Sequence, residues 1–116
     1  MVPKKKTLAN PIIWGEGTWR LLHCMAATFP KEPTEKDFRA YTRFLKSMCP
    51  ILPCRFCREH MRLYIKEHPI LPVLQQGRRA FLLWTVHFHN SVNTKLGKPT
   101  LPVKEALRSI RALCAK

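Results

Sequence analysis

Apolar side chains recur along this chain at intervals of three, four and seven residues, the spacing of one face of an α-helix. Nowhere do they alternate with polar residues over the length of a β-strand. Prolines separate the apolar stretches and end helices, because proline lacks the N–H group that a helix interior needs. The pattern therefore predicts an all-α fold.

Five helical segments are expected, at about residues 14–29, from Thr34 to just before Pro50, and at about 54–67, 78–96 and 103–113. Thr34 with Asp37 three residues later resembles a capping box, which starts a helix. Gly97, followed by a proline two residues on, is typical of a helix end. We expect a four-helix bundle with a shorter fifth helix packed alongside.

The 116 residues are enough for one domain with its own core. We expect a basic N-terminal extension over residues 1–13 and the folded domain over residues 14–116. No apolar stretch approaches the ~18 residues that a membrane-spanning helix requires, so no membrane span is expected. Residues 7–13, which follow the basic start of the chain, are too few and too polar to form the apolar region of a secretory signal peptide.

The chain is strongly basic, with 21 Lys and Arg against 7 Asp and Glu and a net charge of +14. Such an excess indicates an anionic partner: a nucleic acid, an acidic protein, a membrane surface or a phosphorylated cofactor. One cofactor pyrophosphate would use only a few of these charges. A basic surface that merely keeps the protein soluble is the alternative.

The sequence Pro53-Cys54-Arg55-Phe56-Cys57 places two thiols three residues apart where the third helix should begin. The unpaired N–H groups and the dipole at a helix start stabilise a thiolate, and so should lower the pKa of the first cysteine. These are the conditions for thiol–disulfide exchange. Cys54 and Cys57 are therefore the candidate redox-active pair.

Two other interpretations of these cysteines remain open. Cys49, Cys54, Cys57 and His60 are four residues of the types that bind zinc, although structural zinc sites usually draw their ligands from separated segments. The thiols could instead be inert and buried. With five cysteines, at least one thiol stays unpaired within a monomer.

A polar stripe crosses the otherwise aromatic fourth segment. His89, Asn90 and Asn93 fall on one helical arc, with His87 at its edge. Asparagine is unfavourable in the interior of a helix, so two asparagines and two histidines this close together require a reason. Aromatic faces combined with amides suit a flat, partly polar ligand such as a nucleobase or flavin. An exposed face carrying two ordinary histidines is the alternative.

Gly15, Trp19 and His23 lie one turn apart from each other on the first segment. A glycine allows a ligand to approach the backbone closely, which would make this face a second wall of a ligand site. Taken alone, core packing of Trp19 and a hydrogen-bonded buried His23 is the simpler explanation.

In this order and spacing, the three motifs resemble the Erv/ALR family of FAD-dependent sulfhydryl oxidases. The similarity covers about residues 14–99, and its most specific part is His89-Asn90-Ser91-Val92-Asn93 after a C-x-x-C pair. The resemblance implies a four-helix bundle with a short fifth helix that cradles FAD, in agreement with the segments above. It also implies that Cys57 is the flavin-proximal cysteine and Cys54 the interchange cysteine.

The resemblance assigns FAD contacts to residues of the first and fourth segments. On the first it implies Gly15, Thr18, Trp19 and His23. On the fourth it implies His87, Asn90, Val92 and Asn93 near the adenine and ribose, with Lys95 and Lys98 near the phosphates. Trp84 and His89 are further candidates.

The implied reaction oxidises a dithiol protein substrate or an upstream thiol carrier at Cys54 and Cys57, passes the electrons to FAD and then to dioxygen, and releases hydrogen peroxide. The resemblance also implies a homodimer through the first two helices. The chain lacks the second, shuttling cysteine pair of many family members, as do compact forms carried by large DNA viruses. We therefore expect the host cytoplasm or a virus assembly site as its location, with the mitochondrial intermembrane space as the alternative.

Two other functions compete with the oxidase. A basic helical module with a zinc knuckle could bind nucleic acid, with Trp14, Trp19 and Phe56 stacking on bases. The chain could also be a structural interaction protein whose cysteines are incidental. Against the first, the aromatic residues of the fourth segment have the spacing of an internal helix face.

Overall fold

The computed structural model describes residues 7–114, without the side chain of Cys114, and these residues form helices and connecting loops with no strand. Residues 1–6 of the expected N-terminal extension lie outside this range. The helices are α1 (Pro11–Ala27), α2 (Glu35–Met48), the short 3-10 helix η1 (Cys49–Ile51), α3 (Arg55–Glu67), α4 (Ile70–Gln75), α5 (Arg78–Lys95) and α6 (Val103–Cys114). The all-α prediction is confirmed.

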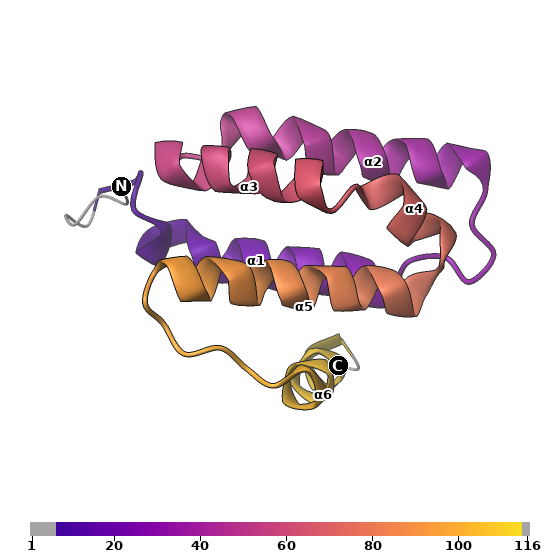
Figure 1. Ribbon diagram of the computed structural model, residues 1–116. Coiled ribbons are helices and arrows are strands. Elements are labelled where there is room, and N and C mark those ends of the chain that lie inside the picture. The colour runs from indigo at the N-terminus through magenta and orange to yellow at the C-terminus, as the bar shows by residue number, and fades with distance from the viewer. Residues whose placement is uncertain (1–6, 115–116) are drawn as a thin grey trace.

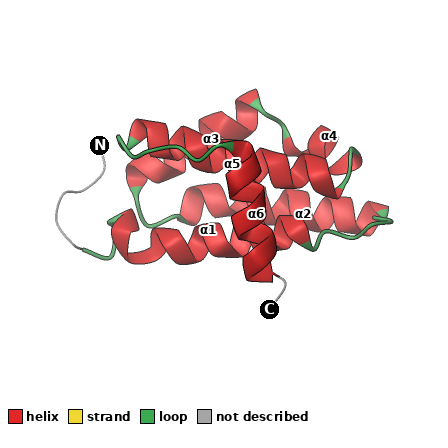
Figure 2. Ribbon diagram, turned by 90° about the horizontal axis from the view of Figure 1, so that it is seen from below, coloured by secondary structure: helices red, strands yellow, loops and turns green. Residues whose placement is uncertain are grey.

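The helices form two layers and a crossing helix. In Figure 1, α2 lies beside α3 and α4 in the upper layer, and α1 lies beside α5 in the lower layer. Helix α6 packs under α1 and α5 and crosses them, as the view from below in Figure 2 shows. Since α3 and α4 together occupy one side of the bundle, the expected four-helix bundle with an additional short helix is present.

Local signals in the sequence set two of the helix ends. Thr34 and Asp37 form the expected capping box at the start of α2: the Asp37 N–H donates to the Thr34 hydroxyl, and the Thr34 N–H donates to the Asp37 carboxylate at 2.8 Å. Gly97 ends α5 with a φ of 71°. The following N–H, of Lys98, reaches back to the Asn93 carbonyl at 2.8 Å, the bond that closes a Schellman motif.

Other boundaries differ from the expected ones. Helix α1 begins at Pro11 rather than near Trp14, because the Asn10 side chain accepts a hydrogen bond from the Ile12 N–H at 3.0 Å. Helix α4 was not expected. Its Pro72 lies in the first turn, where a missing N–H costs no helical hydrogen bond, so a proline there does not prevent a helix.

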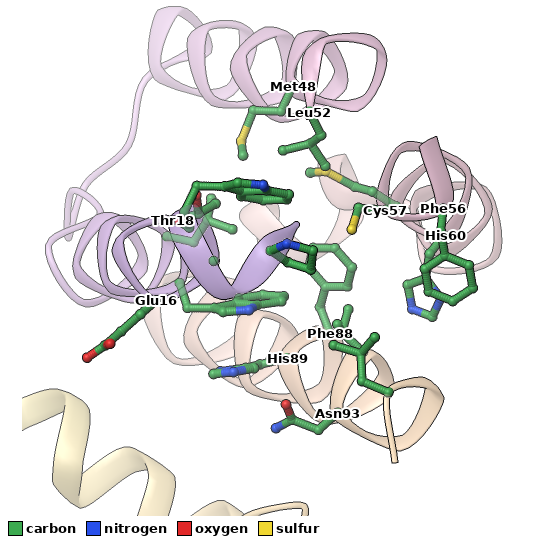
Figure 3. A pocket seen from close by; sticks show the side chains of 18 of the residues that line it. Glu16, Thr18, Met48, Leu52, Phe56, Cys57, His60, Phe88, His89 and Asn93 are labelled. Carbon is green, nitrogen blue, oxygen red and sulfur yellow. The ribbon is translucent and has the colours of Figure 1, made fainter. Parts of the chain in front are cut away.

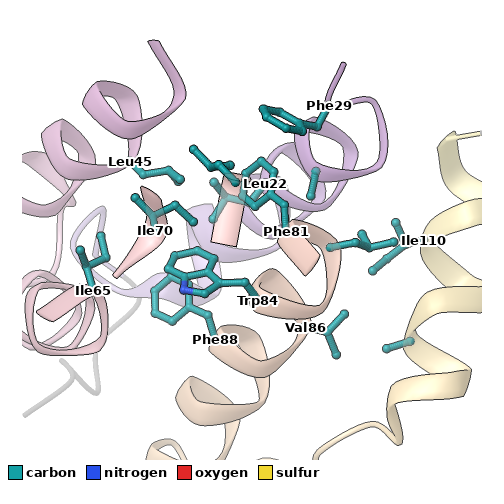
Figure 4. Close-up of a cluster of buried hydrophobic side chains, with 14 of the residues drawn as sticks. Leu22, Phe29, Leu45, Ile65, Ile70, Phe81, Trp84, Val86, Phe88 and Ile110 are labelled. Atoms are coloured by element: carbon teal, nitrogen blue, oxygen red, sulfur yellow. The ribbon is translucent and has the colours of Figure 1, made fainter. Parts of the chain in front are cut away.

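The core fills the space between the layers (Figure 4). Phe29 from the end of α1 meets Tyr41 edge-on at 4.8 Å and Phe81 at 5.7 Å, which ties α1, α2 and α5 together. The residues with least exposure include Leu22, Ala26, Phe29, Leu45, Met61, Ile70, Leu74 and Phe81. Across residues 7–114, no helix combines the length and apolar character needed to cross a membrane.

Candidate active site

A cavity of about 230 Å³ opens at one end of the bundle, between α1, α3 and α5 and the segment that follows α2. Figure 3 shows the Cys57 sulfur reaching into it from α3, with Met48 and Leu52 on one side and His89 and Asn93 on the other. The cavity is lined by Pro11, Trp14, Gly15, Glu16, Thr18, Trp19, Leu22, Met48, Leu52, Phe56, Cys57, His60, Met61, Phe88, His89, Val92, Asn93, Leu96 and Lys98.

The walls of this cavity are flat and aromatic. The rings of Trp19 and His89 stack in parallel, with centroids 4.1 Å apart and an interplanar angle of 8°. Phe88 meets Trp19 edge-on at 5.0 Å, and His60 stacks on Phe88 at 6.2 Å. Such a cavity, with a few polar groups at its edge, suits a flat conjugated ring system.

Behind the Trp19–His89 stack, hydrogen bonds fix the histidine tautomers. Thr85 donates its single hydroxyl proton to the Leu82 carbonyl at 2.7 Å, so its oxygen accepts from Nδ1 of His23 at 3.0 Å. Nε2 of the neutral His23 is then an acceptor and receives the Nδ1 proton of His89, also at 3.0 Å. This chain leaves Nε2 of His89, whose ring lines the cavity, as a hydrogen-bond acceptor.

Burial keeps both histidines of this chain neutral. It is the main cause that lowers the pKa of His23 to about 4, and repulsion from His89 adds to it. Burial also lowers the pKa of His89 to about 4, with a further contribution from the nearby cation of Lys98. At neutral pH the pair therefore offers directed hydrogen bonds rather than positive charge.

The two cysteines of the C-x-x-C motif occupy different surroundings. Cys54 is the N-cap of α3, and its sulfur accepts a hydrogen bond from the Cys57 N–H at 3.3 Å. It is only 1% exposed, whereas Cys57 is half-buried and lines the cavity. Cys57 is thus the member that faces the cavity, and Cys54 is not among the residues that line it.

A hydrogen bond next to this pair ties the start of α3 to the preceding loop, and burial sets the protonation state of Cys57. The Arg58 guanidinium donates to the Leu52 carbonyl at 2.7 Å and so ties α3 to the loop that precedes Cys54. Burial, followed by the hydrogen bond and the repulsion from Cys54, raises the pKa of Cys57 to about 12. In the dithiol state, therefore, Cys57 keeps its proton.

Six of the ten predicted cofactor residues line the cavity. They are Gly15, Thr18, Trp19, Val92, Asn93 and Lys98. His23, His87, Asn90 and Lys95 are not among the side chains that line it.

Each of these four has another place in the structure. His23 lies behind His89 and acts on the cavity through it. Asn90 holds the loop before α6, since its side-chain amide exchanges two hydrogen bonds with the backbone of Leu101, at 2.9 and 3.0 Å. His87 and Lys95 are exposed on α5.

Sequence reasoning missed part of the wall and misplaced another part. Trp14 and Phe56, considered as a platform for bases, line the cavity instead, as Pro11, Met48, Leu52 and Leu96 also do. Trp84 belongs to the core, where its indole N–H donates to the His68 carbonyl at 3.0 Å. The helical spacing of Trp14 with Thr18, one turn on, could have identified the first of these.

The zinc interpretation gains no support from the geometry. His60 bonds through Nε2 to the Ser91 hydroxyl at 3.0 Å and stacks on Phe88 in the cavity wall. Within residues 7–114, no three or more His, Cys, Asp or Glu side chains come together as a metal site.

Comparison with known proteins decides the family. The sequence model of the Erv1 / Alr family matches residues 16–111, which is most of the chain and includes both cysteines of the motif. The chain belongs to the Erv1 / Alr family. The predicted resemblance is thereby confirmed.

Several curated proteins are similar to this Erv1 / Alr chain over most of its length. The FAD-linked sulfhydryl oxidase ERV1 of Oryza sativa subsp. japonica is 38% identical over 105 residues, which are 87% of this chain but only 52% of that one. Protein 347L of Invertebrate iridescent virus 6 is 36% identical over 106 residues, 88% of this chain and 96% of that one. Mitochondrial FAD-linked sulfhydryl oxidases of Schizosaccharomyces pombe and Saccharomyces cerevisiae are also similar, at 36% and 35% identity.

A solved structure has the same fold. The crystal structure of the FAD binding domain of Erv1 from Saccharomyces cerevisiae superposes with a TM-score of 0.75 at 30% identity, and the match covers 84% of this chain and 90% of that one. The chain thus corresponds to a domain that is the whole of one viral relative and about half of the rice relative.

Proposed function

We propose that this chain is an FAD-linked sulfhydryl oxidase, which forms disulfide bonds in protein substrates at Cys54 and Cys57. The observation that carries the proposal is that Cys57 lines the aromatic cavity while Cys54, its partner in the motif, accepts the Cys57 N–H and lies outside that lining. A redox pair with one member at a flat-ring site can pass electrons from a substrate thiol to that site.

The residues of the cavity fit the cofactor. The volume of the cavity is below the ~300–1,000 Å³ of pockets that enclose a whole ligand. The cavity therefore suits the flat rings of FAD, with the remainder of the FAD molecule along the cavity edge. Trp19 and His89 supply the stacking surface, and Asn93 and Thr18 supply polar contacts. Lys98 is the cation at the edge for a phosphate. When bound, FAD supplies a two-electron acceptor that dioxygen can reoxidise, giving hydrogen peroxide.

The exchange steps follow from the two positions. A substrate thiolate attacks the Cys54 sulfur of the Cys54–Cys57 disulfide, forms a mixed disulfide and releases Cys57 as the leaving thiolate. A second substrate thiolate then attacks the substrate sulfur and releases Cys54. The substrate gains a disulfide bond, and the protein holds two electrons as a dithiol.

The environment of Cys57 changes during this exchange. In the dithiol, the hydrogen bond and repulsion from Cys54 add to burial in raising the pKa of Cys57. While Cys54 is bonded to the substrate it carries no charge, so the repulsive contribution disappears and the Cys57 thiolate is opposed less than in the dithiol. The mixed disulfide is thus the state in which the chain tolerates a Cys57 thiolate facing the cavity.

We further propose that the chain acts as a homodimer through α1 and α2. The support is a set of exposed apolar side chains on these helices: Ile12, Ile13 and Leu21 on α1, each at least 51% exposed, and Phe44 on α2. A surface of this kind is typical of an interface between subunits.

The location is proposed from the relatives. Similarity to proteins of large DNA viruses supports a viral origin and, for this compact chain, the host cytoplasm or a virus assembly site. The relatives named mitochondrial support the intermembrane space as the alternative. The excess positive charge supports an acidic protein or a nucleic acid as an additional partner.

Three measurements test the oxidase. The purified protein should be yellow with a flavin spectrum and should consume oxygen when given dithiothreitol. Cys57→Ser should abolish oxygen consumption and keep the flavin colour, while Cys24→Ser, a matched change on α1 outside the cavity, should keep both. A colourless protein, or turnover that survives Cys57→Ser, would contradict the proposal.

A further inference from the structure

A second cavity, of about 560 Å³, lies on the other side of the active-site loop. It is formed by the end of α2, by η1 and by one face of α3, which lie next to each other in the upper layer of Figure 1. Its lining residues are Lys46, Cys49, Pro50, Arg58, Glu59, Arg62, Ile65 and Lys66. None of them lines the aromatic cavity.

The charge of this second cavity is strongly one-sided. Lys46, Arg58, Arg62 and Lys66 give it four positive side chains. The single carboxylate, of Glu59, is occupied by a two-point ion pair with the Arg62 guanidinium, at 2.5 and 3.2 Å. Lys46 and Lys66 are exposed, and no ion pair with a carboxylate is found for either of them within the described residues. The cavity therefore has room and unneutralised charge for anionic groups.

The basic cavity is formed in part by residues that flank Cys54 in the chain. The residues before and after Cys54 divide between the two cavities: Leu52 and Cys57 line the aromatic one, whereas Pro50 and Arg58 line the basic one. Cys54 lies between these residues in the chain, and its side chain is only 1% exposed. A protein whose thiol approaches Cys54 from the side away from the aromatic cavity would therefore have its neighbouring residues close to the basic cavity.

The remaining wall fits a polypeptide. Ile65, Pro50 and Cys49 add apolar surface to the lining of the cavity. Burial raises the pKa of the Cys49 thiol above its ordinary value, so Cys49 is a neutral wall rather than a competing nucleophile. Carboxylates on a flexible segment can reach separate cations in such a cavity.

We propose that this basic cavity binds an acidic segment, rich in Asp and Glu, next to the reactive cysteines of the dithiol protein substrate. The proposal rests on the oxidase function, because it assigns a substrate class to the same Cys54–Cys57 pair. Charge complementarity in the cavity brings the substrate thiolate to Cys54 and raises the rate of productive encounter.

The test compares two charge reversals of equal size. Lys46→Glu/Lys66→Glu changes the cavity, and Arg108→Glu/Arg111→Glu makes the same change of charge at exposed positions of α6, on the opposite side of the molecule (Figure 1). Oxygen consumption by the FAD-loaded protein is measured with dithiothreitol and with two short dithiol peptides, one flanked by glutamates and one by lysines.

The cavity variant should lower kcat/KM for the glutamate-flanked peptide about tenfold, through KM, and keep the rate with dithiothreitol. The α6 variant should keep both values within about twofold. Equal losses in the two variants would show that only overall charge matters and would overturn the proposal, as would a wild-type protein that oxidises both peptides equally well.

Direct binding separates this proposal from the oxidase itself. A fluorescent glutamate-rich peptide with serines in place of cysteines should bind the wild-type protein, and Lys46→Glu/Lys66→Glu should weaken its Kd about tenfold. This result does not depend on turnover, so an inactive protein that still binds would contradict only the oxidase. If a short single-stranded DNA displaced the peptide and bound more tightly than the peptide does, the cavity would be assigned to nucleic acid. That outcome would overturn the proposal.

Discussion

Nε2 of His23 and Nδ1 of His89 lie 3.0 Å apart, and this hydrogen bond connects the core of the bundle to the wall of the aromatic cavity. His23 is anchored to Thr85, which is itself fully buried. The ring that stacks on Trp19 is therefore oriented from behind, by groups that no ligand touches. At least one of the two rings must stay neutral for this hydrogen bond, because protonation of both would place two donors face to face.

The stability of the protein should depend on pH through this pair. Both folded-state pKa values are about 4, below the ordinary 6.5, so the unfolded chain binds more protons between these values. The free energy of unfolding should therefore fall as the pH is lowered from about 6.5 to 4, and this contribution should level off below that. Thermal denaturation at a series of pH values measures it.

A matched pair of variants isolates the cause of this pH dependence. His89→Asn should make the fall between pH 6.5 and 4 shallower, since one of the two buried histidines is removed. His87→Asn, at an exposed position two residues away on α5, should leave the slope as it is in the wild type. Identical slopes in all three proteins would show that the His23–His89 pair does not control acid stability.

Cys54 should have a structural role that can be separated from its redox role. Its sulfur caps α3 by accepting the Cys57 N–H, and a serine hydroxyl can accept the same bond. Cys54→Ala should therefore lower the free energy of unfolding by about 1 kcal/mol relative to Cys54→Ser. Both should abolish oxidation of dithiols. Urea denaturation compares the two, and equal stability would show that the cap contributes nothing.

The Arg58–Leu52 hydrogen bond should limit access to Cys54. Replacing Arg58 by Met removes the bond that ties α3 to the preceding loop, so in the reduced protein iodoacetamide should alkylate Cys54 several-fold faster. Arg55→Met removes a neighbouring positive charge and keeps the loop bond, and should leave the rate near that of the wild type. Mass spectrometry of the alkylated peptide provides the rate, and equal rates in both variants would assign the effect to charge alone.

The fold followed closely from the sequence where local chemistry decides it. The Thr34 capping box and the Gly97 turn require only a few adjacent residues, and both are present as expected. Helix α4 was missed because its six residues contain Pro72 and are too few to show a helical period. What forms this helix is the burial of Ile70 and Leu74 against the core, which the sequence of the segment alone does not reveal.

The site could be predicted only in part, because a cavity wall is assembled from several helices. Asn90 and Asn93 share one helical arc, and periodicity treats them alike. In the fold they separate: Asn93 lines the cavity, while Asn90 meets the backbone of Leu101, eleven residues further on. The contacts made by Met48 and Leu52 depend on how α2 ends, and no motif contains them.

The segment from Met48 to Arg58 contributes to the walls of both cavities. Met48, Leu52 and Cys57 line the aromatic cavity, and Cys49, Pro50 and Arg58 line the basic cavity. A ligand that shifts this segment in one cavity also changes the shape of the other. By thermodynamic linkage such an influence is reciprocal. If a bound substrate segment raises the affinity for the cofactor by some factor, the bound cofactor raises the affinity for that segment by the same factor. The cofactor-loaded and cofactor-free forms of this protein would then differ in their affinity for a partner that never touches the flavin.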